Sequence, residues 1–249
     1  MRRRVIFATL VGIAGLSLAA AGSTAASSTT QTAARPAAPR SAADALGWGP
    51  VVAGDEFNYV GPPKHGKWSV YDSAGNAGKG LRRRSQLTVD GSKAIVTGTS
   101  DGTTGGMSAK FDRRRYGRWE IRMRVPARDP QYHPVLILRP VNGNAPCDGE
   151  VDYAEGSSVT SLMHFFNHYS CENHQTSAAK KIDTTKWHTY AVQLTAAGVV
   201  GYLDGHVWFR DASHVPPTPM HQTIQLDWFP DSTTTRQSSM EVDYVRVYN

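Results

Sequence analysis

The sequence predicts an all-β protein, a sandwich of two antiparallel sheets, and three observations lead to this fold class. Residues 118–125 alternate strictly between apolar and polar side chains, which is the period of a half-buried strand. Two Asp-Gly dipeptides, Asp90-Gly91 and Asp204-Gly205, separate short strand-like runs and predict hairpins. No segment beyond the N-terminal region has a helical period over ten residues. Many short strands joined by Gly and Pro turns are typical of such a sandwich.

The predicted strands follow one another along most of the chain. The Asp-Gly hairpins pair 86–89 with 93–97 and 199–203 with 206–209. Strand 118–125 turns one apolar face toward the core, and this face consists of Trp119, Ile121, Met123 and Val125. Further strands are expected at 135–138, 150–155, 163–169, 188–194, 223–229 and 240–248. The sequence shows no internal repeat and no second linker, so we expect one domain.

The N-terminal region predicts export. Three arginines at positions 2–4 precede an apolar run of 14 residues, too short to span a bilayer, and then small residues. We therefore expect a cleaved signal peptide over residues 1–25, a disordered leader rich in Ala, Thr and Pro over 26–44, and the folded domain over 45–249. The mature protein is expected to be extracellular, monomeric and free of the membrane.

The basic character of the chain does not indicate a nucleic-acid partner. The formal net charge is +6, but five arginines and no acid lie in residues 1–40, which leaves only +1 for the rest. The arginine runs at 82–84 and 113–115 lack the interleaved aromatic residues of a nucleic-acid surface. A solvated face, or contact with an acidic glycan, explains these runs better.

Three carboxylates occupy one short apolar run, Glu150-Val-Asp152-Tyr-Ala-Glu155. Side chains alternate along a strand, so Glu150 and Asp152 share a face, and one β-bulge after Asp152 returns Glu155 to it. Glycosidic cleavage requires a pair of carboxylic acids. An acidic, solvated strand face is the alternative that the motif alone leaves open.

The two cysteines fit the same hairpin. If 150–155 pairs with 163–169 around a turn near Val159, opposed residue numbers add up to about 318, and those of Cys147 and Cys171 do so too. An exported protein favours a disulfide between them over two free thiols.

The ordered set of motifs resembles glycoside hydrolase family 16, in the branch with a bulged catalytic strand. The matching segments span residues 50–249 and are 54–57 (GDEF), 116–122 (YGRWEIR), 150–155 (EVDYAE), 187–192 (WHTYAV), 202–205 (YLDG) and 242–248 (VDYVRVY). The resemblance implies a jelly-roll, concanavalin-like sandwich whose substrate lies across a concave sheet. One departure is the segment 134–140 (PVLILRP), where many relatives have a Trp and where Arg139 adds a cation.

The resemblance also implies roles for individual residues. Glu150 would be the nucleophile, Glu155 the acid/base, and Asp152 the residue that tunes both. Other residues at matching positions are expected to contact substrate, and they are Arg122, His168 and Gln225. No cofactor or metal is expected in catalysis, although some relatives hold a structural calcium ion, for which Asp243 is the candidate here.

The expected function is therefore a secreted, retaining endo-β-glycanase. The substrate would be a polysaccharide, with a β-1,3- or mixed-linkage β-glucan as the first choice. A non-catalytic glycan-binding module and a cell-wall transglycosylase on the same fold are the alternatives. The three acids disfavour the module, whereas nothing in the sequence separates a hydrolase from a transferase.

Overall fold

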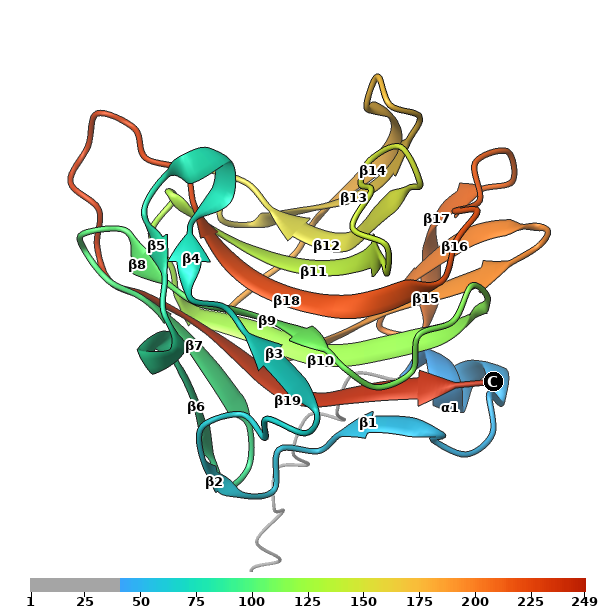
Figure 1. Ribbon diagram of the computed structural model, residues 1–249, viewed down its shortest axis with the longest axis horizontal. Coiled ribbons are helices and arrows are strands. Elements are labelled where there is room, and N and C mark those ends of the chain that lie inside the picture. Colours follow the sequence, from blue (N-terminus) through green and yellow to red (C-terminus); the bar gives the residue numbers. More distant parts are fainter. Residues whose placement is uncertain (1–40) are drawn as a thin grey trace, which may run out of the picture. The chain divides into compact units, whose positions relative to one another are not determined.

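The computed structural model describes residues 41–249, which form two large antiparallel sheets packed face to face and one small sheet (Figure 1). The predicted all-β jelly-roll sandwich is confirmed. The predicted signal peptide, and the leader as far as residue 40, lie outside the described residues. None of the helices in residues 41–249 is long and apolar enough to cross a membrane.

The nine-stranded sheet forms the lower layer in Figure 1. In spatial order it contains β17 (His206–Asp211), β16 (Gly198–Leu203), β15 (His188–Thr195), β10 (Gly117–Ala127), β19 (Ser238–Tyr248), β7 (Ala94–Gly98), β6 (Leu87–Asp90) and β2 (Val60–Gly61), with β1 (Ala53–Asp55) paired to β19.

The seven-stranded sheet curves over this layer. Its order is β14 (His174–Lys181), β13 (Leu162–Tyr169), β12 (Glu150–Gly156), β11 (Tyr132–Pro140), β18 (Met220–Trp228), β9 (Gly106–Ala109) and β3 (Trp68–Val70). The small sheet and the helices are β4 (Ser73–Ala74), β5 (Leu81–Arg82), β8 (Thr103–Thr104), α1 (Ala42–Leu46), η1 (Asn76–Gly78) and η2 (Arg84–Gln86).

The alternation predicted for residues 118–125 is confirmed in β10. The apolar face, from Trp119 to Val125, is at most 1% exposed and packs in the core between the two sheets. Apolar residues from the seven-stranded sheet fill the other half of this core, and they include Leu136, Leu138, Tyr153, Phe165, Ile224 and Leu226.

Both predicted hairpins form. In the second, Leu203 pairs with His206, and Asp204 and Gly205 have the positive φ values, 50° and 75°, that a primed turn requires. In the first, the turn lies one residue later than predicted. The Asp90 N–H donates to the Lys93 carbonyl (3.1 Å), so Gly91 and Ser92 form the turn, and the φ of 99° falls on Gly91.

A short helix that the sequence did not predict covers the outer face of the nine-stranded sheet. The Ser41 side chain caps α1 by accepting from the Asp44 N–H (2.9 Å). The helix is held by Glu120, a fully buried carboxylate on the polar face of β10, which accepts from the Ala42 N–H (2.7 Å) and the Ala43 N–H (3.2 Å). The predicted domain boundary at residue 45 therefore lies inside α1.

Replacing Glu120 by Ala is expected to lower the free energy of unfolding by about 3 kcal/mol, because buried donors lose their acceptor. These donors include the Tyr244 hydroxyl, which lies 2.9 Å from the carboxylate. Urea denaturation measures the change. The matched control is Glu56→Ala, which removes an exposed carboxylate paired with Arg246 (2.8 Å) and should cost about 1 kcal/mol or less. Equal losses in both variants would contradict this anchoring role.

Candidate active site

The predicted bulge in β12 brings three carboxylates to one face of the seven-stranded sheet. Asp152 lies opposite Phe166 of β13, whereas Glu155 lies opposite His164, so β12 contains one extra residue between these pairs. The bulge buries Tyr153 completely in the core. Glu150, Asp152 and Glu155 together line a cleft of about 190 Å³ on the outer face of the sheet. The prediction of a shared face is confirmed.

The remaining walls of the cleft come from strands far apart in the sequence. β11 and β18 contribute alternate residues that point away from the core, and the segment from η1 to β5 covers one end. The lining side chains are Asn76, Arg82, Val135, Ile137, Arg139, Gln225, Asp227 and Phe229. On the other side of β12, the rings of His164 and Phe166 stack 5.3 Å apart beside the acids. Such a ring face suits the apolar face of a sugar.

Cations neutralise all but one of the acids in the cleft. The Arg139 Nε lies 2.8 Å from the Glu150 Oε2. Asp152 is paired with His168, whose Nε2 lies 3.2 Å from its Oδ2. Glu155 has no ion pair with any residue of the described domain.

The fourth acid of the cleft also has a partner. The Arg82 Nη2 lies 2.5 Å from the Asp227 Oδ1 and donates to the Gln225 Oε1 (3.2 Å). Arg82, Arg139 and His168 therefore account for three of the four carboxylates that lie here.

Burial and nearby negative charge raise the pKa of both glutamates. Burial raises the pKa of Glu155 to about 8, helped by the negative charges of Asp152 and Asp227. Burial and Asp152 also raise the pKa of Glu150, but the charge of Arg139 opposes this shift. At neutral pH, Glu155 thus holds a proton. Pushing the pKa values of two carboxyls apart is how a site separates an acid from a nucleophile.

His168 is held from both sides. Its Nδ1 lies 2.8 Å from the Asn173 Oδ1, and its Nε2 faces Asp152. Burial alone would lower the pKa of His168, but the hydrogen bonds to Asp152 and Asn173 and the nearby carboxylates raise it. The imidazolium is therefore stabilised as the counter-ion of Asp152.

Several buried polar atoms of the cleft have no hydrogen-bond partner in residues 41–249. They are the Arg82 Nε, Glu150 Oε2, Asp152 Oδ1 and Gln225 Nε2. The Glu150 Oε2 is close to Arg139, but the geometry is that of an ion pair without a well-directed hydrogen bond. Unpaired buried donors and acceptors are costly, so their concentration here indicates a surface made for a polar, hydroxyl-rich ligand.

The structure brings His168 and Gln225 to the acids, as the sequence predicted, but not Arg122. Arg122 lies on β10 of the opposite sheet, where it forms an ion pair with Asp243 (2.6 Å) and lies over the Trp187 ring. The core of the sandwich separates it from the cleft. The expected contact of Arg122 with substrate beside the acids is therefore corrected.

Asp243, the candidate calcium ligand, forms an ion pair with Arg122 through its Oδ2 (2.6 Å). Within residues 41–249, the one group of three side chains able to hold a metal is Glu150, Asp152 and His168, whose ligand atoms lie within 4.8 Å of one another. Arg139 and the His168–Asp152 pair already neutralise these carboxylates. Calcium binding at Asp243 stays a prediction.

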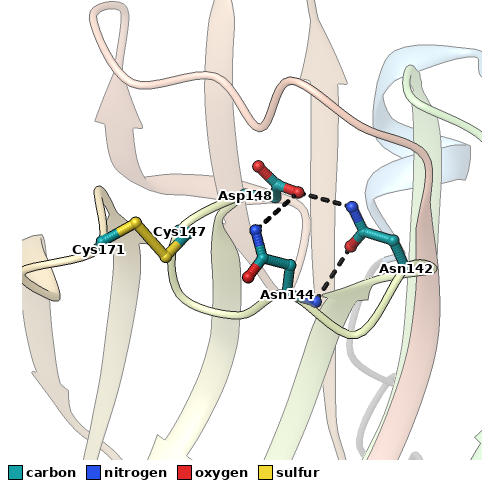
Figure 2. The surroundings of a disulfide bond; sticks show 5 residues. All are labelled: Asn142, Asn144, Cys147, Asp148 and Cys171. Carbon is teal, nitrogen blue, oxygen red and sulfur yellow. Dashed lines mark hydrogen bonds between the residues drawn. A yellow bond between two sulfur atoms is a disulfide. The ribbon is translucent and has the colours of Figure 1, made fainter.

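The predicted disulfide is present and closes the hairpin that carries the acids. Cys147 and Cys171 have a Cα–Cα distance of 4.0 Å and flank the Glu150–His168 pair of the β12–β13 ladder. Figure 2 shows the disulfide beside a polar loop, in which the Asp148 Oδ2 accepts from the side-chain amides of Asn142 (2.6 Å) and Asn144 (3.2 Å). The loop before β12 is therefore fixed by both covalent and polar contacts.

Replacing both cysteines by Ser is expected to lower the free energy of unfolding by about 2–4 kcal/mol, since the unfolded chain loses a closed loop. The sequence separation of this loop is 24 residues. Urea denaturation of the oxidised protein and of the Cys147→Ser/Cys171→Ser variant measures the difference. A reducing agent should destabilise the original protein and leave the variant unchanged; equal sensitivity in both would contradict the prediction.

A concave antiparallel sheet with one ion-paired carboxylate and one protonated carboxylic acid is the arrangement of a glycoside hydrolase. The sequence places the chain in this class independently. The profile of the family described as glycosyl hydrolases family 16 matches residues 71–246, and the chain belongs to this family. No functionally curated protein matches the sequence.

Several solved structures share the fold. LamAcat from Zobellia galactanivorans superposes with a TM-score of 0.72 at 18% identity, over 82% of this chain and 100% of that chain. The catalytic domain of an endo-1,3-β-glucanase (laminarinase) from Thermotoga petrophila RKU-1 gives 0.71 at 19% identity, over 80% and 97%. The laminarinase from Rhodothermus marinus gives 0.70 at 24% identity, over 80% and 96%.

Proposed function

We propose that the protein is an exported endo-acting β-glycanase that hydrolyses a polysaccharide with retention of configuration. The observation that carries this proposal is the distribution of charge in the cleft. Glu150 is paired with a cation, whereas Glu155 has none and keeps a proton because its pKa is raised to about 8. A nucleophile and an acid are thus present on one strand, as a double displacement requires.

In the first step, the Glu150 carboxylate attacks the anomeric carbon while Glu155 gives its proton to the departing glycosidic oxygen. The resulting ester neutralises Glu150, and the negative charge moves to Glu155. In the second step, Glu155 takes a proton from a water molecule, which attacks the anomeric carbon and releases Glu150. Asp152 lies between the two glutamates, and its charge, held by His168, favours the protonated form of Glu155.

The first choice of substrate is a β-1,3- or mixed-linkage β-glucan. Similar solved structures include LamA from Z. galactanivorans in complex with laminaritriose and laminaritetraose. Another is SCLam, a non-specific endo-β-1,3(4)-glucanase with a bound gluco-oligosaccharide. The cleft is open at the surface of the sheet, which suits attack within a chain. The N-terminal sequence supports export, and we propose that the protein acts as a monomer outside the cell.

A polysaccharide panel tests this proposal. Laminarin, lichenan, agarose, carrageenan and xyloglucan are incubated with the protein, products are sized, and new reducing ends are counted. Laminarin or lichenan should give short oligosaccharides, and NMR should show the β-anomer first. Transfer of chain ends without new reducing ends would indicate a transglycosylase. Binding without cleavage of any polymer would overturn the enzymatic proposal in favour of a glycan-binding module.

The activity should fall on the alkaline side as the pH rises through about 8, because the acid form of Glu155 is then lost. A pH profile of kcat/KM measures this limb. In Asp152→Asn, one of the negative charges that raise the pKa of both glutamates is removed. Both limbs of the profile should therefore move to lower pH in this variant. An alkaline limb that stays in place would contradict the role given to Asp152.

A further inference from the structure

Arg139 has more hydrogen-bonding capacity than the protein uses. It extends from β11 into the cleft, and its side chain is 39% exposed. Its Nε forms an ion pair with Glu150, and within residues 41–249 no side chain or backbone group accepts a well-directed hydrogen bond from its guanidinium. Since a guanidinium has five N–H donors in a planar fork, its Nη edge is free for a ligand.

The neighbour of Arg139 on β18 adds no negative charge to this side of the cleft. His221 lies directly opposite Arg139 in the β11–β18 ladder. Burial, together with the charges of Arg113 and Arg139, lowers the pKa of His221 to about 4, so this histidine is neutral near pH 7. Glu150 is the carboxylate that contacts Arg139, whereas the charge of Asp227 acts on it from a greater distance. At the other side, Arg82 is already neutralised by Asp227.

The catalytic cycle would remove the counter-ion of Arg139 at the moment when substrate covers it. When Glu150 becomes an ester, its negative charge moves to Glu155, and Arg139 loses the one carboxylate in direct contact with it while a sugar is bound. Burying an unpaired charge is costly, whereas a neutral polysaccharide supplies only hydroxyl groups. An anionic group on the sugar would supply the missing charge, and the planar fork of Arg matches carboxylate and sulfate oxygens.

We propose that Arg139 is a specificity residue that binds an acidic substituent, a carboxylate or a sulfate, on the sugar bound beside Glu150. This inference rests on the proposed glycanase function and narrows its substrate class to a β-glycan that carries anionic groups. The acidic group contacts the free Nη edge while the Nε continues to face Glu150. Arg139 then keeps a counter-ion throughout the reaction, in both the free nucleophile and the ester.

Chemically matched polymers test the proposal. Laminarin, lightly carboxymethylated laminarin and lightly sulfated laminarin have the same backbone and differ in charge. The unmodified protein should show a higher kcat/KM on at least one charged derivative than on laminarin. In Arg139→Gln, the ratio of charged to neutral kcat/KM should fall by about 10- to 100-fold, the effect of a hydrogen bond between charged groups. Any general loss from the altered nucleophile cancels in this ratio.

Two further variants test whether the change in the ratio is specific to the Arg139 guanidinium. Arg210→Gln removes an exposed cation on β17 of the other sheet and should leave the ratio unchanged. Arg139→Lys keeps the charge but not the planar fork. Its ratio of charged to neutral kcat/KM should lie between those of the unmodified protein and Arg139→Gln. Preference for only the carboxymethyl or only the sulfate derivative identifies the acidic group. An equal ratio in the unmodified protein and Arg139→Gln overturns the proposal.

Binding measurements separate this proposal from the proposed function. If none of the three polymers is cleaved, the hydrolase assignment for this backbone fails, and affinity electrophoresis then decides the role of Arg139. Stronger retardation by a charged derivative than by laminarin, lost in Arg139→Gln and kept in Arg210→Gln, would still support acidic-group recognition. Equal retardation of Arg139→Gln and Arg210→Gln by the charged derivative would overturn acidic-group recognition by Arg139.

Discussion

Glu150→Gln should reduce the turnover of polysaccharide by about four orders of magnitude or more, since removal of a nucleophile has effects of this size. An amide cannot form the ester, and it also leaves Arg139 without its carboxylate partner, 2.8 Å away. Reducing-end assays on the cleaved polymer measure the loss. The fold should remain intact, because removing one of several crowded carboxylates relieves repulsion, and circular dichroism would verify this.

Chemical rescue distinguishes a lost nucleophile from a disturbed site. Azide should restore part of the activity of a Glu150→Ala or Glu150→Gly variant, because a small anion can occupy the space beside Arg139 and attack the anomeric carbon. The product would then be a glycosyl azide of inverted configuration. The same anion should have no such effect on Asp152→Asn, where the nucleophile is still present. Near-native activity of Glu150→Gln on the true polymer would refute the nucleophile assignment and the retaining mechanism.

Glu155→Gln should separate two kinds of substrate. Cleavage of polysaccharide should fall by about 100- to 10,000-fold, because the leaving oxygen needs the proton that Glu155 holds. An aryl glycoside with a good leaving group, such as a dinitrophenyl oligosaccharide, needs no proton for departure and should still form the ester. Stopped-flow release of the phenolate measures this first step. The alkaline limb near pH 8 should also disappear with this substitution.

The matched comparison is between the two glutamates on the activated substrate. Glu150→Gln should lose the phenolate burst, whereas Glu155→Gln should keep it and then stall, since the second step lacks its base. Equal losses of both variants on polymer and on aryl glycoside would show that the two acids do not have distinct roles.

The hairpin that carries the acids was predictable because its information is local. The spacing of Glu150, Asp152 and Glu155 already implies a bulge, and the register implied by this hairpin also pairs the two cysteines. The residues of the cleft walls were harder to predict from the sequence. Gln225 was expected from its matching position in the family, but Arg82 and Asp227 lie 145 residues apart and form their ion pair only through the topology of the sheets.

Arg122 shows where strand alternation stops being informative. The pattern in 118–125 correctly separated a buried face from a polar one, but it contains nothing on which of the two sheets the strand joins. A polar face of the nine-stranded sheet points away from the cleft, so the residue contacts Asp243 there. Helix α1 was missed for a related reason: it has five residues, and it is stabilised by the distant Glu120 carboxylate more than by its own periodicity.

The position of α1 also determines where the domain can be joined to a solid support or a fusion partner without covering the cleft. The helix lies on the outer face of the nine-stranded sheet, and the strand that ends the chain finishes next to it, with the Trp48 ring 5.6 Å from Tyr248 (Figure 1). The acids open on the far side of the sandwich. A surface, resin or fusion partner joined at Ser41 or Asn249 would therefore leave the cleft facing outward, and immobilised protein should digest long polymers without loss of access.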